Sequence, residues 1–323
     1  MAIASHFIKE IILLGPGKKG KGMNTYQYHL GNIHISSENE LKQFTLLQEE
    51  LESNRMLYEV PIQGIQLREL NKWNDSYLSG KYRMHKNPYN QHEIWKNDGC
   101  KETVEILRDL IIVSKTDVTA IFYSQEEAIY GCLRNKICSI IREYVLGYSL
   151  FGIHTALIRI DTKKILIIGS KSSGKTSSVL NALKHNGKVY TDELIFVDEN
   201  LNVSWLKRFP AITNKTIKQY FEDSNLHIKG EIYSELAGEK KCLLDIEFYK
   251  DDNFPLWEID NIYILPLNTN NTTSHADKKR IITDNWLTGK YKSNEVIEVF
   301  EKILDKSKMI TISQLKKIYA EVR

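Results

Sequence analysis

Residues Ile165–Leu183, which read ILIIGSKSSGKTSSVLNAL, constrain the fold of this chain more than any other stretch. The four apolar residues 165–168 predict a buried strand, and Val179 and Leu183 have the spacing of one helix face. Between them, residues 169–176 read GSKSSGKT, a full match to the pattern G-x-x-x-x-G-K-[ST]. A strand, a glycine loop and a helix in this order are the context in which such a loop binds phosphate. The stretch therefore predicts a nucleotide-binding loop.

Each residue type in this loop has a physical role beside a phosphate group. Gly169 and Gly174 let the backbone turn tightly, so that successive N–H groups point at phosphate oxygens. The helix that follows adds the positive end of its dipole. Lys175 is long enough to reach the β- and γ-phosphates of ATP or GTP, and the Thr176 hydroxyl suits Mg²⁺. We expect the nucleotide to be held by the loop and the serine after it: Gly169, Ser170, Lys171, Ser172, Ser173, Gly174, Lys175, Thr176 and Ser177.

The composition excludes several classes of protein. The net charge is +3, from 44 basic and 41 acidic residues, which is too balanced to indicate nucleic acid or membrane as the main partner. No run of 18 apolar residues predicts a membrane span, and the N-terminal residues lack the pattern of a signal peptide. The four cysteines form no C-x-x-C pair, which favours reduced thiols. We therefore expect a cytoplasmic protein.

The periodicity predicts two domains of mixed α and β structure, with a boundary near Ser124. Residues 1–124 are expected to form a smaller α+β domain that serves in substrate recognition. Its aromatic and polar stretch 71–99 is either an irregular loop or a substrate-facing surface. Residues 125–323 are expected to form the catalytic domain.

Local patterns predict several elements on both sides of this boundary. They predict strands at 26–35 and 117–123, a helix within 40–51 and a long helix over 125–146. The strand before the glycine loop is expected to pair antiparallel with residues 155–160, which gives a mixed sheet. Hairpin strands over 194–206, further strands at 242–249 and 261–267, and two C-terminal helices complete the pattern. The spacing of Thr311 and Gln314 predicts a capping box for the last helix.

Phosphoryl transfer also needs a carboxylate near the γ-phosphate, to hold Mg²⁺ or to accept a proton. Two acid pairs follow the loop helix. Asp198–Glu199 comes after four apolar residues, as a Walker B acid does, but the expected hairpin turn lies away from the loop. Asp192–Glu193 comes where the next strand returns beside the loop. We therefore favour Asp192 as metal ligand or base.

This constellation resembles the catalytic domain of HPr kinase/phosphorylase and its relatives. The resemblance rests on His154-Thr155-Ala156, the hairpin, the loop and helix, and then Gly187–Glu193. The basic-Phe-Pro segment Lys207–Ile212 also resembles HPr-kinase-like proteins of peptide-modification pathways. The resemblance implies a C-terminal fold like that of phosphoenolpyruvate carboxykinase. It implies phosphate transfer from ATP, with Mg²⁺, to a serine hydroxyl on a carrier protein or a precursor peptide.

By position, the resemblance implies a role for each residue of the motif. Lys175 would bind phosphate, Thr176 and Asp192 would bind Mg²⁺, and Asp192 or its partner Glu193 would act as base. His154 would lie beside the phosphates, although the residue pattern alone leaves open a structural histidine in the core. The chain departs from the family at Glu193, where an aspartate is usual, and it has no convincing L-E-x-R-G signature. The likeness therefore favours a divergent relative over an enzyme that acts on HPr.

The expected function is thus that of a kinase that phosphorylates a Ser or Thr hydroxyl, with a precursor peptide or small protein as the favoured substrate. Two alternatives stay open at this point: a kinase of a small hydroxylated metabolite, and a P-loop ATPase or regulatory nucleotide-binding protein. A small-molecule kinase usually opens with its phosphate loop, whereas here the loop begins at Gly169. A regulator would need no base such as Asp192. A homo-oligomer is compatible with the resemblance.

Overall fold

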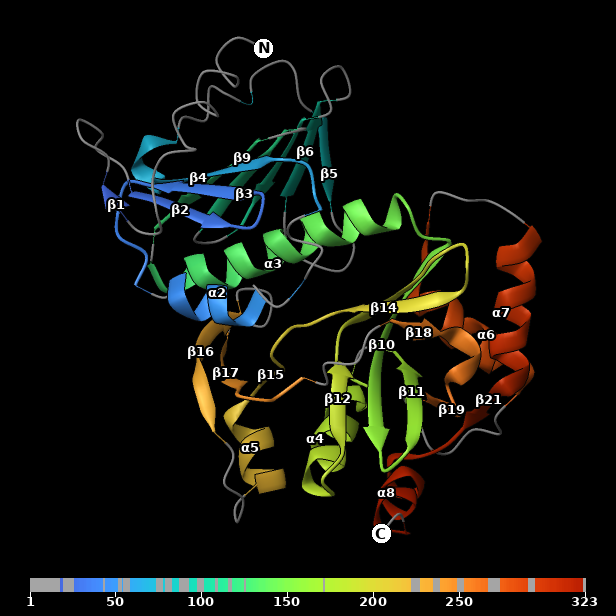
Figure 1. Cartoon of the computed structure of the whole chain (residues 1–323). Coiled ribbons are helices and arrows are strands. Elements are labelled where there is room, and N and C mark those ends of the chain that lie inside the picture. Colours follow the sequence, from blue (N-terminus) through green and yellow to red (C-terminus); the bar gives the residue numbers. More distant parts are fainter. Residues whose placement is uncertain are drawn as a thin grey trace. The chain divides into compact units, whose positions relative to one another are not determined.

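A computed structural model gives the structure of the protein. It describes residues 18–19, 26–42, 44–51, 54, 59–73, 78, 83–86, 93–97, 102–107, 110–115, 118–124, 126–170, 172–221, 227–234, 239–248, 253–266, 274–289 and 294–321. These residues form a mixed α and β structure with several sheets, as the sequence predicts (Figure 1).

The chain divides into two compact units. Unit 1 comprises Met1–Ile141 and Gly230–Cys242, and unit 2 comprises Arg142–Lys229 and Leu243–Arg323. This division lies later in the chain than the boundary expected near Ser124, because most of the long helix α3 belongs to unit 1. A segment far along the sequence also joins unit 1, which no local pattern indicates.

Unit 1 is built on a nine-stranded mixed sheet in the order β1-β2-β3-β4-β9-β8-β7-β6-β5. The pairs β3–β4 and β4–β9 are parallel, and the other pairs are antiparallel. The strands are β1 (Lys18–Lys19), β2 (Tyr26–Leu30), β3 (Ile33–Ser37), β4 (Gln63–Glu69), β5 (Arg83–Lys86), β6 (Glu93–Asn97), β7 (Glu102–Ile106), β8 (Leu110–Ser114) and β9 (Val118–Tyr123). The helices are α2 (Phe44–Leu51), η2 (Leu70–Lys72) and α3 (Glu126–Leu146).

Two sequence predictions for unit 1 need correction. The run 26–35 is a hairpin and not one strand, because Gly31 takes a positive φ of 57° and turns the chain back on itself. The stretch 71–99 is not irregular throughout, since it contains the antiparallel strands β5 and β6. The strand near 117–123 and the helices near 40–51 and 125–146 are confirmed.

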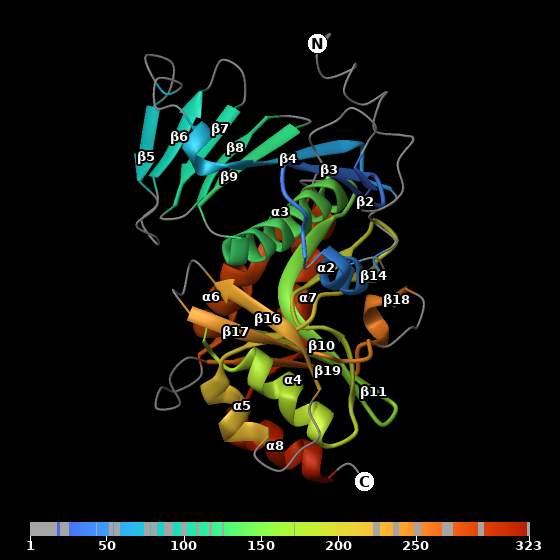
Figure 2. The same cartoon turned by 90° about the vertical axis from the view of Figure 1, so that its left-hand side faces the viewer.

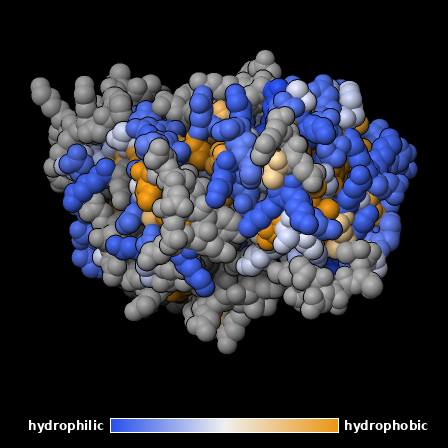
Figure 3. Space-filling model, turned by 90° about the horizontal axis from the view of Figure 1, so that it is seen from below, coloured by the Kyte–Doolittle hydropathy of each residue, from blue (hydrophilic) through white to orange (hydrophobic). Residues whose placement is uncertain are grey.

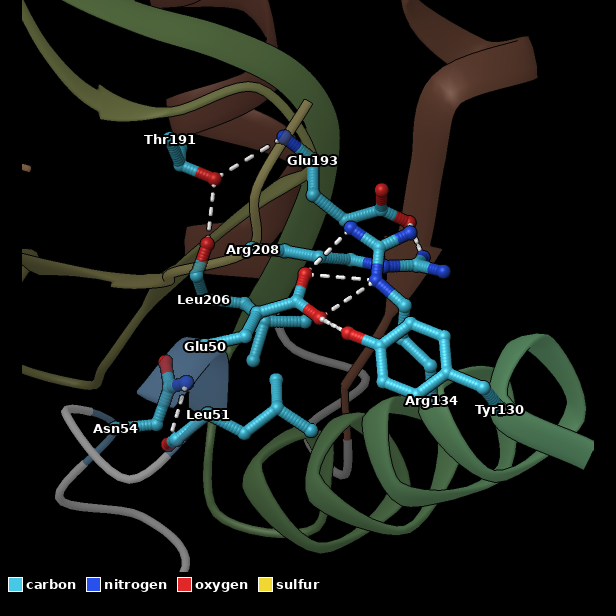
Figure 4. Close-up of polar contacts among 9 residues, drawn as sticks. All are labelled: Glu50, Leu51, Asn54, Tyr130, Arg134, Thr191, Glu193, Leu206 and Arg208. Atoms are coloured by element: carbon cyan, nitrogen blue, oxygen red, sulfur yellow. Dashed lines mark hydrogen bonds and ion pairs between the residues drawn. The ribbon is translucent and has the colours of Figure 1, made fainter. Parts of the chain in front are cut away.

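A buried ion pair joins α2 and α3 inside unit 1 (Figure 4). The guanidinium of Arg134 lies against the carboxylate of Glu50, with Nη2 2.5 Å from Oε1. The Tyr130 hydroxyl donates to the other carboxylate oxygen at 3.1 Å. Both charges are almost fully buried, so each needs the other to offset its loss of hydration. The pair therefore ties α3 to unit 1 despite its place beyond the expected boundary.

Unit 2 is built on a second nine-stranded sheet, whose main path runs β18-β14-β13-β10-β11-β19-β21. The hairpin β10–β11 is antiparallel as predicted, and the parallel pairs β11–β19 and β19–β21 make the sheet mixed. Its strands are β10 (Phe151–Ile160), β11 (Lys163–Gly169), β12 (Lys188–Thr191), β13 (Leu194–Val197), β14 (Asn202–Leu206), β18 (Phe254–Pro255), β19 (Asn261–Leu265), β20 (Trp286–Thr288) and β21 (Ser307–Met309). A third sheet has the order β15-β17-β16, from β15 (Ala211–Ile212), β16 (Ile228–Ser234) and β17 (Glu239–Leu244). Most of β16 and β17 belongs to the 230–242 segment of unit 1.

The long strand β10 exchanges both of its neighbours half-way along its length. On one edge, β20 pairs with residues 151–153 and β11 pairs with residues 155–160. On the other edge, β13 pairs with residues 151–154 and β12 with residues 157–159. His154 therefore lies at the point where one neighbouring strand ends and the next begins, on both edges of β10.

The helices of unit 2 are α4 (Lys175–Lys184), α5 (Asn214–Phe221), η4 (Leu256–Glu258), α6 (His275–Asn285), α7 (Asn294–Lys306) and α8 (Ile312–Glu321). Helices α6 and α7 contribute apolar side chains to the core formed by β10, β11, β13 and β19. Helix α8 packs against α4 (Figures 1 and 2). The predicted capping box of α8 is confirmed, because the Gln314 amide N–H donates to the Thr311 hydroxyl and the Thr311 amide donates to Gln314. Helix α6, which the sequence analysis missed, also begins with a capping box, formed by Ser274 and Asp277.

Gly289 fixes the end of β20 against β10. Its N–H donates to the Leu150 carbonyl at 3.2 Å, and a Cβ at this position would overlap the carbonyl oxygens of Ser149 and Leu150. We expect Gly289→Ala to lower the free energy of unfolding by about 1–3 kcal/mol, because backbone atoms cannot move aside as a side chain can. Thermal denaturation of the full chain measures this. Thr288→Ala, at the exposed neighbouring position, is the control, and equal stability of the two variants would contradict the packing argument.

The described residues include no helix long and apolar enough to cross a membrane. On the face seen in Figure 3, the coloured residues are mostly hydrophilic, and the hydrophobic ones form small separate patches. The described cysteines Cys132, Cys138 and Cys242 are buried, and none of these three forms a disulfide.

Candidate active site

The glycine loop has the strand-loop-helix context that the sequence predicts. Strand β11 ends at Gly169, and α4 begins at Lys175. Ser172 and Gly174 have positive φ angles of 65° and 100°, so the backbone turns sharply at both positions. A non-glycine residue in this conformation is strained, and such strain occurs at functional turns. Lys171 lies outside the described residues.

The Lys175 ammonium is enclosed by its own loop. Its Nζ donates to the carbonyl of Gly169 and, at 3.4 Å, to that of Ser170, and only 7% of the residue is exposed. Burial lowers the pKa of Lys175, while the nearby carboxylates of Asp192 and Glu193 act in the opposite direction. The amine is therefore positioned at the centre of the loop, next to the acid pair.

Within the loop, Ser173 is buried and its hydroxyl has no hydrogen-bond partner among the described residues. The Gly174 Cα faces the C-terminal helix, since a Cβ there would overlap the Ile312 side chain. The start of α8 therefore supports the loop from outside. Ser177 lies in the first turn of α4 and is partly buried.

The acid pair Asp192–Glu193 occupies the bend between β12 and β13, which both pair with β10. Figure 4 shows Glu193 at this bend, with Thr191 before it. The Thr191 hydroxyl fixes this bend, because it donates to the Leu206 carbonyl at 2.6 Å and accepts from the Glu193 amide at 3.0 Å. The Thr155 amide donates to the Glu193 carbonyl at 3.2 Å. These bonds anchor the bend to β10 beside His154, so the pair lies across one strand from the start of the glycine loop.

Asp192 has an unusual environment for a carboxylate. Its Oδ1 is buried and has no hydrogen-bond partner among the described residues, and the side chain is hydrogen-bonded to Thr176. Its pKa is raised to about 7, chiefly by burial and also by the negative charge of Glu193, while the Thr176 bond and Lys175 act against the shift. The carboxyl group therefore exchanges a proton near neutral pH, at a point touching the glycine loop.

Glu193 forms an ion pair with Arg208, with Oε1 3.2 Å from Nη1 (Figure 4). Arg208 follows β14, whose last residue is held to the acid bend through Thr191. The basic-Phe-Pro segment is thus brought to the acid pair. Arg280 is not part of this group, because it is exposed and pairs with Asp277 on its own helix.

His154 lies half-buried at the centre of these groups. Burial lowers its pKa first, and the positive charges of Lys175 and Arg208 add to this effect. Glu193 and a hydrogen bond with Asn285 act in the opposite direction. The histidine therefore lies near charged groups of the glycine loop, the acid bend and the segment after β14. Asn285 was missed from sequence because it ends a helix that no pattern predicted.

The second acid pair has a structural role in a turn. The Asp198 carboxylate accepts from the backbone amides of Asn200 at 2.9 Å and Asn202 at 2.8 Å. It closes the β13–β14 hairpin at the end remote from the acid bend, as the sequence analysis expects. Asp198 therefore stabilises a turn, and the structure brings Asp192 to the loop in its place.

The residues at the loop fit a magnesium ion bound together with phosphates. Among the described residues, no three His, Cys, Asp or Glu side chains are grouped to hold a metal by themselves. Mg²⁺ usually takes one or two protein oxygens and completes its shell with phosphate and water. The Thr176 hydroxyl and the unpartnered Oδ1 of Asp192 are oxygens of this kind.

No family model matches the chain, and a search of curated proteins finds no significant match. The likeness to HPr kinase/phosphorylase is therefore carried by the motif residues alone.

Proposed function

We propose that this protein is a Mg²⁺- and ATP-dependent kinase of the HPr-kinase-like type, acting in the cytoplasm. Its acceptor would be a Ser or Thr hydroxyl on a precursor peptide or small protein. The observation that carries the proposal is Asp192, a carboxylate that has a buried oxygen and is hydrogen-bonded to Thr176 of the glycine loop. A carboxylate at a phosphate-binding loop can hold Mg²⁺ or accept the proton of a hydroxyl.

The loop residues would hold the nucleotide. Lys175 would exchange its bonds to the Gly169 and Ser170 carbonyls for bonds to phosphate oxygens, and loop amides would donate to the same phosphates. Thr176 and Asp192 would hold Mg²⁺, which neutralises charge on the phosphates when it is bound. Either ATP or GTP fits this arrangement, and we propose ATP from the resemblance.

The acid pair would serve the acceptor. Asp192, or Glu193 beside it, takes the proton of the hydroxyl as the new oxygen–phosphorus bond forms and the bond to the leaving ADP breaks. Arg208 supplies a second positive charge next to this acid pair and would stabilise the phosphoryl group. The structure of the acid bend supports this division of roles. Thr191 and Thr155 bind the backbone of Glu193, so its carboxylate is not needed for these bonds that fix the bend.

The test is mass spectrometry of Ser- and Thr-containing peptides and small proteins incubated with the full chain, ATP and Mg²⁺. We expect a gain of one phosphate on a Ser or Thr side chain, and its loss when Mg²⁺ is chelated. The panel also contains hydroxylated metabolites, and a gain of phosphate on one of these alone would indicate a metabolite kinase. Release of phosphate to solution only, across the whole panel, would overturn the kinase proposal in favour of an ATPase or regulator.

A further inference from the structure

Asn285 is a buried amide whose orientation is fixed from two directions. Its Nδ2 donates to the Ile281 carbonyl at 2.8 Å, one turn back in α6, and only 5% of the residue is exposed. The other end of the amide, Oδ1, is then the group that faces a donor. The hydrogen bond between Asn285 and His154 favours the protonated ring, so a ring N–H donates to Oδ1.

The sheet register explains why these two residues meet. Trp286 pairs with Ile153 in the antiparallel β20–β10 ladder. Asn285, which precedes Trp286, therefore comes beside His154, which follows Ile153. Strand β20 is anchored at its far end by Gly289, and α6 is anchored at its start by the Ser274 capping box. The position of Asn285 is therefore set by the fold and not by a flexible loop.

The charged groups around His154 come from three further elements. Lys175 belongs to α4, Glu193 to the acid bend and Arg208 to the segment after β14. Burial and the two cations outweigh Glu193 and Asn285, so the pKa of His154 is lowered from its ordinary value and the ring is neutral at pH 7. A neutral imidazole has one N–H and one acceptor nitrogen.

We propose that Asn285 is a positioning residue that holds His154 in one tautomer, leaving its second ring nitrogen as an acceptor for the substrate hydroxyl. An acceptor nitrogen takes a hydrogen bond from O–H, whereas phosphate oxygens at neutral pH offer no proton. His154 therefore orients the Ser or Thr hydroxyl before Asp192 or Glu193 takes its proton, and its role differs from the phosphate contact that the family resemblance implies. The role toward the hydroxyl rests on the proposed function; the tautomer does not.

The tautomer is measured by NMR of the full chain labelled with ¹⁵N-histidine, without nucleotide, with His154 assigned from its absence in His154→Gln. We expect one protonated and one acceptor nitrogen in the wild type. Asn285→Leu removes the acceptor oxygen, so the two tautomers should mix and the pKa of His154 should fall. Asn285→Asp keeps an oxygen at the same place, so the same nitrogen should stay protonated while the pKa rises.

Thr283→Val is the matched control, since Thr283 also donates to a carbonyl one turn back in α6 but is exposed. It should leave the His154 signals unchanged. An unchanged tautomer and pKa in a folded Asn285→Leu would overturn the proposal. If that variant does not fold, the same nitrogen and a raised pKa in Asn285→Asp support it, and an unshifted pKa there overturns it.

Kinetics then test the consequence for the acceptor. Asn285→Leu should raise the KM for the hydroxyl substrate by about 3- to 10-fold, the scale of one lost hydrogen bond, with the KM for ATP nearly unchanged. An increase in the KM for ATP alone would overturn the hydroxyl role. If the chain phosphorylates no acceptor, the kinase proposal fails while the NMR result still decides the role of Asn285.

Discussion

Lys175→Ala is expected to reduce kcat/KM by about 10³-fold or more, because phosphoryl transfer depends on positioned charge and this residue supplies the charge inside the loop. The ammonium is buried against the Gly169 and Ser170 carbonyls, inside the loop. The measurement is phosphate transfer to a peptide found by the mass-spectrometric panel. Binding of a fluorescent ATP analogue should weaken in parallel.

The control is Lys184→Ala, which removes an exposed lysine from the last turn of the same helix. It should leave both activity and nucleotide binding close to those of the wild type. The Lys175 variant should also stay folded, because burial disfavours the charged ammonium and alanine removes that cost. Activity near the wild-type level in Lys175→Ala would remove the glycine loop from the mechanism.

Local patterns were sufficient to predict the loop and its immediate surroundings. The antiparallel hairpin β10–β11, the loop helix and the Thr311–Gln314 capping box all depend on residues close together in sequence. The choice of Asp192 over Asp198 also followed from local order, since a strand that directly follows the loop helix returns beside the loop. In the structure, Asp192 is hydrogen-bonded to Thr176 of the loop, and Asp198 lies in the β13–β14 turn.

Features that depend on distant pairing were not predicted. Strand β20 follows the unpredicted helix α6, and it pairs with β10 across more than a hundred residues of chain. No local pattern therefore indicates that Asn285 meets His154. The hairpin at Gly31 is a different case, because a Gly-Asn pair between alternating runs is a recognised turn signal that was missed. Register between strands far apart in sequence is set by core packing, which no single local pattern records.

Asp192→Asn is expected to lower kcat by at least about 10²-fold and, at the same time, to stabilise the protein without nucleotide and Mg²⁺. The amide keeps the shape of the carboxylate and can still accept from Thr176, but it cannot take a proton. Its neutral charge also removes the cost of burying a carboxylate. A pKa raised from 3.8 to about 7 corresponds to about 2–4 kcal/mol of destabilisation at high pH, allowing for partial solvent access.

The pH dependence of this stabilisation follows from the direction of the shift. Because the pKa of Asp192 is higher in the folded chain, the folded state binds more protons between about pH 4 and pH 7, and stability falls as the pH rises through that range. The melting temperatures of wild type and Asp192→Asn should therefore agree near pH 4 and separate by several degrees at pH 8. Asp198→Asn is the matched control: its activity should stay near wild type, and it should show no pH-dependent gain, since its carboxylate caps a turn. A large activity loss in Asp198→Asn, with Asp192→Asn nearly active, would show that the wrong acid pair has been placed at the loop.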